Sequence, residues 1–131
     1  MGILNPTPGE IIDRQTILTL KIKHCLTDTD VKAFQKEYDE LGGYFIEAFD
    51  YDGDIFDEDT FKAYQKSLQD INTELWGLED ERRKWIKSTS SDRMRAIANN
   101  AEITTNLNDE RAKLIKAINT LYNINVVEKI Y

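Results

Sequence analysis

Acidic side chains and arginines gather in three short segments of this 131-residue chain, in combinations that binding and catalytic sites use. The segments are Pro8-Gly9-Glu10-Ile11-Ile12-Asp13-Arg14 (motif 1), Glu74-Leu75-Trp76-Gly77-Leu78-Glu79-Asp80-Glu81-Arg82-Arg83 (motif 2) and Asn108-Asp109-Glu110-Arg111-Ala112 (motif 3). A carboxylate beside a guanidinium can hold an anionic ligand or, with a second carboxylate, a divalent cation. The same residues can instead form buried or half-buried ion pairs that fix how helices align.

Eight residues of the motifs are candidates for ligand binding: Glu10, Asp13, Arg14, Glu79, Asp80, Arg83, Asn108 and Arg111. Glu10 and Arg14 are four residues apart, as are Glu79 and Arg83, so each pair can bond along a single helix. This spacing favours structural ion networks. A polar pocket for a small anion or a divalent cation is the alternative interpretation. The motifs do not identify a catalytic residue.

The elements that would position these motifs are helices, because apolar residues recur at intervals of three and four along most of the chain. Thr7-Pro8-Gly9-Glu10 has the pattern of a capping box, with Thr7 as the N-cap. The predicted helices run from Pro8 to about Leu26, from about Val31 to Phe49, from about Glu58 to Lys87, and from about Asp92 to Tyr122. The Gly42-Gly43 pair predicts a bend in the second helix. We therefore expect an all-α fold in one domain over residues 1–131, a helical bundle of about four helices built on a long antiparallel hairpin.

The hairpin of the third and fourth helices also predicts which motif residues can meet. Counted from a turn centred near residue 90, Arg111 should face Gln69 or Asp70, and Glu79 should face about Ala101. Motifs 2 and 3 then lie about 10 Å or more apart along the hairpin, so only the first helix could join all three motifs in one site. The third and fourth helices are each about 45 Å long. The first and second helices are shorter, so we expect them to leave part of the apolar surface of this hairpin uncovered. We expect the chain to bury this surface by forming a two-fold homodimer.

Composition and charge exclude several classes of function. The net charge is −7, so binding to duplex nucleic acid, which depends on clustered cations, is not expected. Six cations between Arg82 and Arg95 form a basic cluster, which we interpret as a solvated helix end. No apolar run is long enough to cross a bilayer and no signal peptide is evident, so we expect no membrane partner. The single cysteine, Cys25, fits a reducing, cytoplasmic location.

Familiar metal and nucleophile motifs do not fit the sequence. The acidic segment 50–59 resembles a calcium-binding loop, but with Gly53 at the glycine position the first ligand would be Ala48. The only histidine, His24, adjoins Cys25, and neighbours on a helix point about 100° apart, so they do not form a nucleophile–base pair. We expect no metal and no cofactor.

A further alternative is the all-α nucleotide pyrophosphatase, which holds magnesium with two acidic pairs on adjacent helices. The sequence offers Glu37-x-x-Glu40 and Glu47-x-x-Asp50. Only six residues separate these pairs within one helical stretch, so they cannot face each other across two helices. The spacing therefore argues against this enzyme.

Taken together, the motifs resemble a known family. The similarity is carried by Pro8-Gly9-Glu10 with Ile12-Asp13-Arg14 and Thr16-Ile17-Leu18, Glu74-Leu75-Trp76 with Glu79-Asp80, Asn108-Asp109-Glu110-Arg111-Ala112 with Ile118-Asn119, and Glu128-Lys129 with Tyr131. These residues are similar to the motifs of a family of small helical bacterial and phage proteins that is catalogued as a domain of unknown function. The resemblance spans most of the chain apart from about Asp28 to Lys66, and it implies neither an activity nor a catalytic residue.

The sequence thus predicts a non-catalytic binding or assembly module whose partner is another protein or a second copy of the chain. The alternative is a small-molecule binding protein or enzyme, with a carboxylate and arginine pocket for a nucleotide or a sugar phosphate.

Overall fold

The computed structural model describes residues 5–49 and 58–122. It contains four helices: α1 (Pro8–His24), α2 (Asp28–Phe49), α3 (Glu58–Lys87) and α4 (Arg93–Leu121). The predicted all-α bundle is confirmed, and each helix begins and ends within three residues of its predicted bounds. The acidic loop over 50–57 and the C-terminal tail over 126–131 lie outside the described residues.

The start of α1 is fixed by the predicted capping box. The Thr7 hydroxyl accepts a hydrogen bond from the Glu10 amide at 3.2 Å, and the Glu10 carboxylate accepts one from the Thr7 amide at 3.3 Å. Two backbone donors at the helix start are thereby satisfied. Motif 1 therefore begins with a capped helical turn, which sets the direction of every later side chain on α1.

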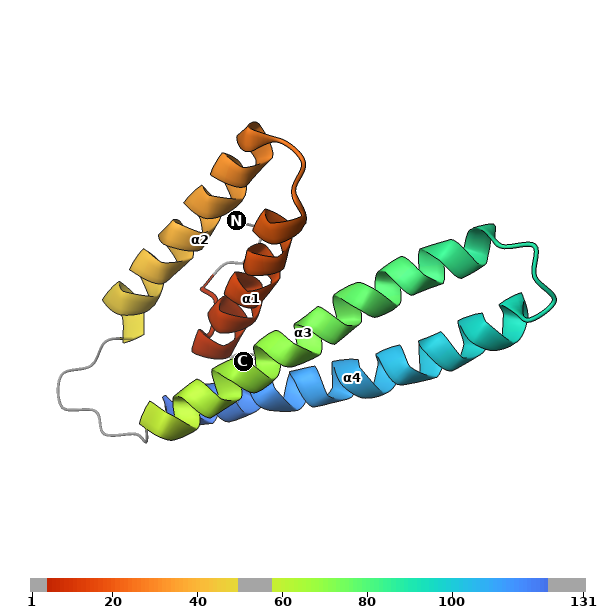
Figure 1. Cartoon of the computed structure of the whole chain (residues 1–131). Helices are drawn as coiled ribbons and strands as arrows, with labels where there is room; N and C mark the ends of the chain where they lie inside the picture. Colours follow the sequence, from red (N-terminus) through yellow and green to blue (C-terminus); the bar gives the residue numbers. More distant parts are fainter. Residues whose placement is uncertain (1–4, 50–57, 123–131) are drawn as a thin grey trace.

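α1 lies at the centre of the bundle, with α2 on one side and the α3–α4 hairpin on the other (Figure 1). Its neighbouring residues Ile11 and Ile12 point about 100° apart and enter different apolar clusters. Ile11 packs with Leu18 and residues of α2, whereas Ile12 packs with Leu68 of α3 and Ile118 of α4. The bundle therefore depends on α1 to hold its two hairpins together.

α2 runs through Gly42 and Gly43 as a continuous helix. Aromatic rings at its C-terminal end reach the other hairpin: Phe45 contacts both Phe61 of α3 and Tyr122 beyond α4, with ring centroids 6.3 and 5.6 Å apart. Phe49 contacts the same tyrosine at 6.1 Å. This cluster fixes the open end of the α3–α4 hairpin against α2.

The opposite end of the α3–α4 hairpin extends well past α1 and α2 (Figure 1). His24 at the end of α1 stacks on Trp76 of α3, with the ring centroids 5.0 Å apart. We call residues 77–103 beyond this stack the arm. Along the arm Ala101 is exposed, whereas its neighbour Asn100 is buried. The Asn100 side chain donates a 2.8 Å hydrogen bond to the Leu78 carbonyl and so links the two helices.

Within the described residues, no helix is both long enough and apolar enough to cross a membrane. α3 and α4 have the length but are mostly charged or polar on their outer faces.

Candidate functional site: a buried aspartate–arginine junction

One residue each from motifs 1 and 3 meets in the structure. The Arg111 Nε donates to Asp13 Oδ1 at 2.8 Å, and its Nη2 donates to Oδ2 at 2.6 Å. Asp13 is only 7% exposed, and the Arg111 side chain is 30% exposed. A two-bond pair of this kind fixes both position and orientation. The pair therefore fixes the position of α1 on α4 at the level of Asp13 and Arg111.

α3 contributes to the same junction through Asn72, which is buried. The Asn72 Nδ2 donates to Asp13 Oδ1 at 3.0 Å and to the Thr16 hydroxyl at 2.6 Å. Thr16 in turn donates to the backbone carbonyl of Asp13 at 2.7 Å. An amide nitrogen has two protons, so Asn72 uses both of its donors here. Three helices thus converge on one carboxylate.

The junction keeps Arg111 charged. Its hydrogen bond to Asp13 raises the pKa of Arg111 above its ordinary value, and the attraction of the two charges acts in the same direction. Burial opposes both by disfavouring the charged form. Because the guanidinium remains protonated throughout the physiological range, this pair holds its geometry and does not exchange protons.

A second polar contact joins α1 to α4 one turn away from the first. The Gly9 amide donates to Asn119 Oδ1 at 2.7 Å, and Asn119 is 1% exposed. A Cβ at Gly9 would overlap the backbone carbonyl oxygen of Ile115 and would lie 2.9 Å from its Cγ2. Glycine is therefore required for the close approach of the two helices. The Asn119 Nδ2 has no hydrogen-bond partner among the described residues.

The other charged residues of motif 1 do not enter the junction. Glu10 completes the helix cap, with its carboxylate also 2.8 Å from the Thr7 hydroxyl. Arg14 bonds to Glu37 of α2 through three contacts of 2.9 to 3.2 Å. The expected bond between Glu10 and Arg14 along the helix is thus replaced by a cap and by a bridge between helices.

Motif 2 lies on the exposed surface of α3, partly on the arm. Glu79 bonds to Arg82 at 2.7 Å and lies 3.7 Å from Arg83, the partner expected from the spacing. Arg83 also pairs with Asp80 at 3.3 Å. The hydrogen bond from Arg82 lowers the pKa of Glu79 below its ordinary value of 4.5, and the same bond raises the pKa of Arg82.

Of the eight candidate residues, the structure brings Asp13 and Arg111 together across two helices, and it brings Glu79, Asp80 and Arg83 together along α3. Asn108 is exposed on α4, and Glu10 and Arg14 form the separate contacts described above. The uncharged partners Thr16, Asn72 and Asn119 are not among the candidate site residues, although Thr16 and Asn119 belong to the segments that carry the family resemblance. The sequence pattern that could identify such partners is an uncharged polar residue at or beside a core-facing position of a helix. Asn72 follows Leu68 by one helical turn, and Asn119 adjoins Ile118.

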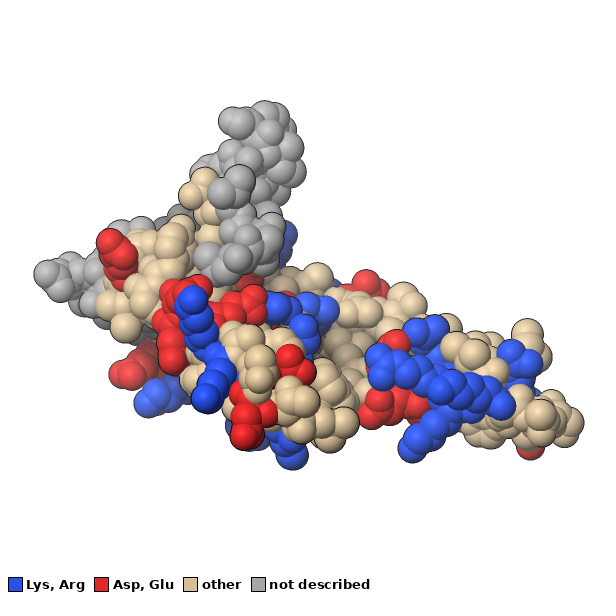
Figure 2. All heavy atoms as spheres, turned by 90° about the horizontal axis from the view of Figure 1, so that it is seen from above, with Lys and Arg blue, Asp and Glu red and all other residues tan. Residues whose placement is uncertain are grey.

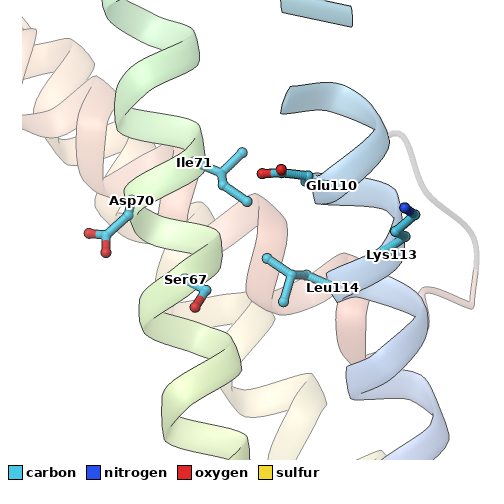
Figure 3. A pocket seen from close by; sticks show the side chains of 6 residues that line it. All are labelled: Ser67, Asp70, Ile71, Glu110, Lys113 and Leu114. Atoms are coloured by element: carbon cyan, nitrogen blue, oxygen red, sulfur yellow. The ribbon is translucent and has the colours of Figure 1, made fainter. Parts of the chain in front are cut away.

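A groove of about 460 Å³ lies between α3 and α4, with α1 behind both helices (Figure 3). It is lined by Ser67, Asp70, Ile71, Glu110, Lys113 and Leu114. A second groove of about 340 Å³ lies where α1 meets α2 and α3, beside Thr16 and Lys66. None of the eight candidate residues lines either groove. In the part of the chain that the structure describes, no three His, Cys, Asp or Glu side chains lie close enough to hold a metal ion.

No family model, curated protein or solved structure matches this chain. The resemblance to the family of small helical bacterial and phage proteins therefore stays a prediction that rests on its motifs.

Proposed function

We propose that the protein is a non-catalytic binding or assembly module. The observation that supports this best is that the charged motif residues bind one another. Asp13 pairs with Arg111, Arg14 pairs with Glu37, and the acids of motif 2 pair with arginines of the same helix. Groups that are already paired in this way are not available to bind a ligand.

The Asp13–Arg111 junction is especially unsuited to ligand binding. Its carboxylate accepts three side-chain hydrogen bonds, two from Arg111 and one from Asn72. An incoming anion would have to break a pair that lies largely out of water, which leaves a buried charge without compensation. We infer that the junction fixes the position of α1 on the hairpin and so sets how far the arm projects.

The arm is the element that we expect to bind. Its two helices cover each other on one side only, so its apolar residues are half-buried at most. Ile86, Met94 and Ile103 are all exposed on it. We propose that these residues contribute to a partner contact, because apolar surface exposed on an otherwise polar protein marks places where proteins bind partners.

A second candidate function is the binding of a small anion, and the α3–α4 groove favours it. Glu110 of motif 3 lines this groove together with Lys113, whose ammonium group could pair with a phosphate (Figure 3). In this case the groove, and not the Asp13–Arg111 junction, would be the site.

A thermal-shift screen with nucleotides, sugar phosphates and Mg²⁺ separates the two functions. A ligand that binds the native state at 100 times its dissociation constant stabilises the fold by about 2.7 kcal/mol. For a binding or assembly module we expect no increase in melting temperature with any of these compounds.

The screen is paired with two lysine variants of α4. Lys113→Ala removes the cation of the groove, and Lys116→Ala removes an exposed cation that does not line it. A compound that stabilises the wild type and Lys116→Ala but not Lys113→Ala would contradict the proposed function and support the second candidate.

We also propose that the protein works in the cytoplasm and belongs to the resembled family. A reducing compartment is compatible with Cys25, which is the only cysteine in the chain and cannot form an internal disulfide.

A further inference from the structure

A cleft runs along one side of α1, between α2 and α3. α1 packs against both of these helices, whereas α2 and α3 hardly touch each other apart from an aromatic contact near the end of α2. Figure 1 shows α2 and α3 diverging on either side of α1. The groove of about 340 Å³ lies in this cleft, and a smaller groove of about 180 Å³ shares Thr19 and Tyr38 with it. The cleft therefore extends along α1 from Ile12 to Ile22.

The cleft has a cationic lining, although the chain as a whole carries a net charge of −7. Among the described residues that line it there is no acid, and the charged ones are Lys62 and Lys66, one turn apart on α3. These lysines pair with Glu58 and Asp70 of their own helix at 3.7 and 3.4 Å. Because both pairs are exposed, they hold the ammonium groups only weakly. The two lysines are therefore available to carboxylates that enter the cleft.

Uncharged hydrogen-bonding groups form most of the remaining lining. Three glutamines come from two helices, Gln15 from α1 and Gln65 and Gln69 from α3. Gln15 donates to the Tyr38 carbonyl at 3.3 Å, whereas the half-buried side chains of Gln65 and Gln69 have no hydrogen-bond partner among the described residues. A carboxamide both donates and accepts, as the N–H and C=O groups of a peptide backbone require. The cleft thus offers free amides to an extended chain.

We propose that the cleft binds an extended, acidic segment of a partner protein. The inference rests on the proposed assembly function and names the chemistry of the partner. Ile12 and Ile22 are ten residues apart, about 15 Å along α1, which about five residues of an extended chain span. Carboxylates of the segment pair with Lys62 and Lys66, and its backbone forms hydrogen bonds with the glutamine side chains.

The arm is less suited to the same segment, although it carries more cations. Figure 2 shows lysines and arginines over the arm with acids among them, and residues 77–103 include five acids beside six cations. Arg82 and Arg83 are already paired with Glu79 and Asp80. An acidic segment would be repelled by carboxylates on the arm, whereas the lining of the cleft has none among the described residues.

An NMR titration of the full chain, labelled with nitrogen-15, tests the proposal with acetyl-pentaglutamate amide as the probe. We expect the largest shift changes in the side-chain amide signals of Gln15, Gln65 and Gln69 and in the backbone amides of residues 12–22. Changes centred on residues 82–95 would place the peptide on the arm and overturn the inference. The absence of saturable changes at millimolar peptide would overturn it as well.

Two lysine variants test the charge contact. Lys66→Glu should raise the dissociation constant of pentaglutamate on the order of fivefold to tenfold, because it replaces attraction by repulsion. Lys36→Glu is the matched control, because Lys36 is 78% exposed like Lys66, pairs with an acid four residues later, and does not line the cleft. Equal effects of the two substitutions would mean that only the net charge of the chain matters, and would exclude the cleft as the site.

Gln69→Met tests the contact with the peptide backbone. It removes a donor and an acceptor while keeping the length of the side chain, so binding should weaken by about threefold to tenfold. The NMR spectrum of the variant shows directly whether the fold is retained. Unchanged binding of pentaglutamate to a folded Gln69→Met would contradict the proposed backbone contacts.

Free glutamate distinguishes an extended segment from a single anion. At the same total concentration of carboxylate it should not displace pentaglutamate, because it cannot reach both lysines and the glutamines together. Displacement by free glutamate would show that the cleft binds single anions, and the inference of an extended segment would fall.

The outcomes also separate this inference from the proposed function. Failure of pentaglutamate to bind, together with a blank thermal-shift screen, would overturn the inference and leave the assembly function to a partner of other chemistry. A nucleotide or sugar phosphate that raises the melting temperature would overturn the assembly function itself.

Discussion

The buried ion pair of Asp13 and Arg111 fixes how α1 lies on α4 more than it raises the free energy of unfolding. Desolvation of two charges offsets much of their attraction, so such a pair adds little compared with well-packed apolar residues. Its directional bonds nevertheless allow one arrangement of α1 on α4 and penalise the others. The bond from Asn72 extends the same alignment to α3.

Arg111→Met should be strongly destabilising if the pair is structural. It leaves the Asp13 carboxylate buried without its cation, and we expect a loss of about 3–5 kcal/mol in the free energy of unfolding, measured with urea. Arg83→Met is the control, because Arg83 forms its ion pairs on the exposed surface and should change stability little. Stability that is retained or raised in Arg111→Met would mean that the charge is kept for function and not for the fold.

The lowered pKa of Glu79 predicts that the local stability of the arm depends on pH. A carboxylate whose folded pKa lies below its unfolded value of 4.5 stabilises the fold above pH 4.5 and loses this effect as the pH falls through the folded pKa. The protection of the amides near residues 79–83, measured as their exchange relative to an unfolded chain at the same pH, should therefore fall below about pH 4.5. The effect should be small, because the pair with Arg82 is exposed.

Glu79→Gln should remove this loss of protection, since glutamine does not titrate. Glu81→Gln removes the same charge from an exposed neighbouring position and serves as the control. Equal acid profiles for the wild type and Glu79→Gln would show that the bond to Arg82 does not stabilise the arm. Arg111 contributes nothing in this range, because its pKa is raised and any loss of stability from its titration falls at strongly alkaline pH.

At the scale of elements, the sequence was sufficient to predict the helices. The capping box of Thr7 and Glu10 and the spacing of apolar residues on each helix are local signals, and both are satisfied by contacts within a few residues. The antiparallel register of α3 and α4 was also predictable, because a short turn leaves few alternatives. The bond between Leu78 and Asn100 lies within two residues of the predicted pairing of Glu79 with Ala101.

The partners of the charged residues were not predictable for a physical reason. Sequence spacing shows which residues can meet along one helix. The packing of α1 between α2 and the α3–α4 hairpin decides which residues meet across helices. Arg14 had a local partner available in Glu10, yet Glu10 serves the cap and Arg14 reaches Glu37, 23 residues later. The meeting of Asp13 with Arg111 depends on the same packing.

Gly9→Ala tests how closely α1 approaches α4. Its Cβ would overlap the backbone of Ile115, which cannot move without shifting α4, so we expect a loss of about 1–3 kcal/mol or more. Gly43→Ala is the matched control, because a Cβ there meets nothing within 4 Å and replaces glycine within a helix. That variant should be up to about 1 kcal/mol more stable than the wild type. Equal effects of the two substitutions, measured by thermal and urea unfolding, would contradict the close approach.

On the scale of the whole molecule, stability should fall from the body toward the tip of the arm. Around α1 the core is covered on several sides, whereas the arm has two helices and no third layer among the described residues. Amides that open easily are those with few buried contacts around them. Hydrogen exchange should therefore be slowest over residues 11–18 and fastest, among the helices, over residues 84–96. Uniform protection along α3 and α4 would contradict this gradient.

The contacts that secure α1 join nearly opposite ends of the chain. Asp13 and Arg111 are 98 residues apart in sequence, and Gly9 and Asn119 are 110 residues apart. During synthesis at about 5–20 residues per second, α1 therefore leaves the ribosome roughly 5–20 seconds before its binding surface on α4 exists. In that interval first α2 and then α3 become available to cover its apolar side chains. A nascent chain halted before residue 111 therefore lacks the arginine that pairs with Asp13 and cannot complete this fold.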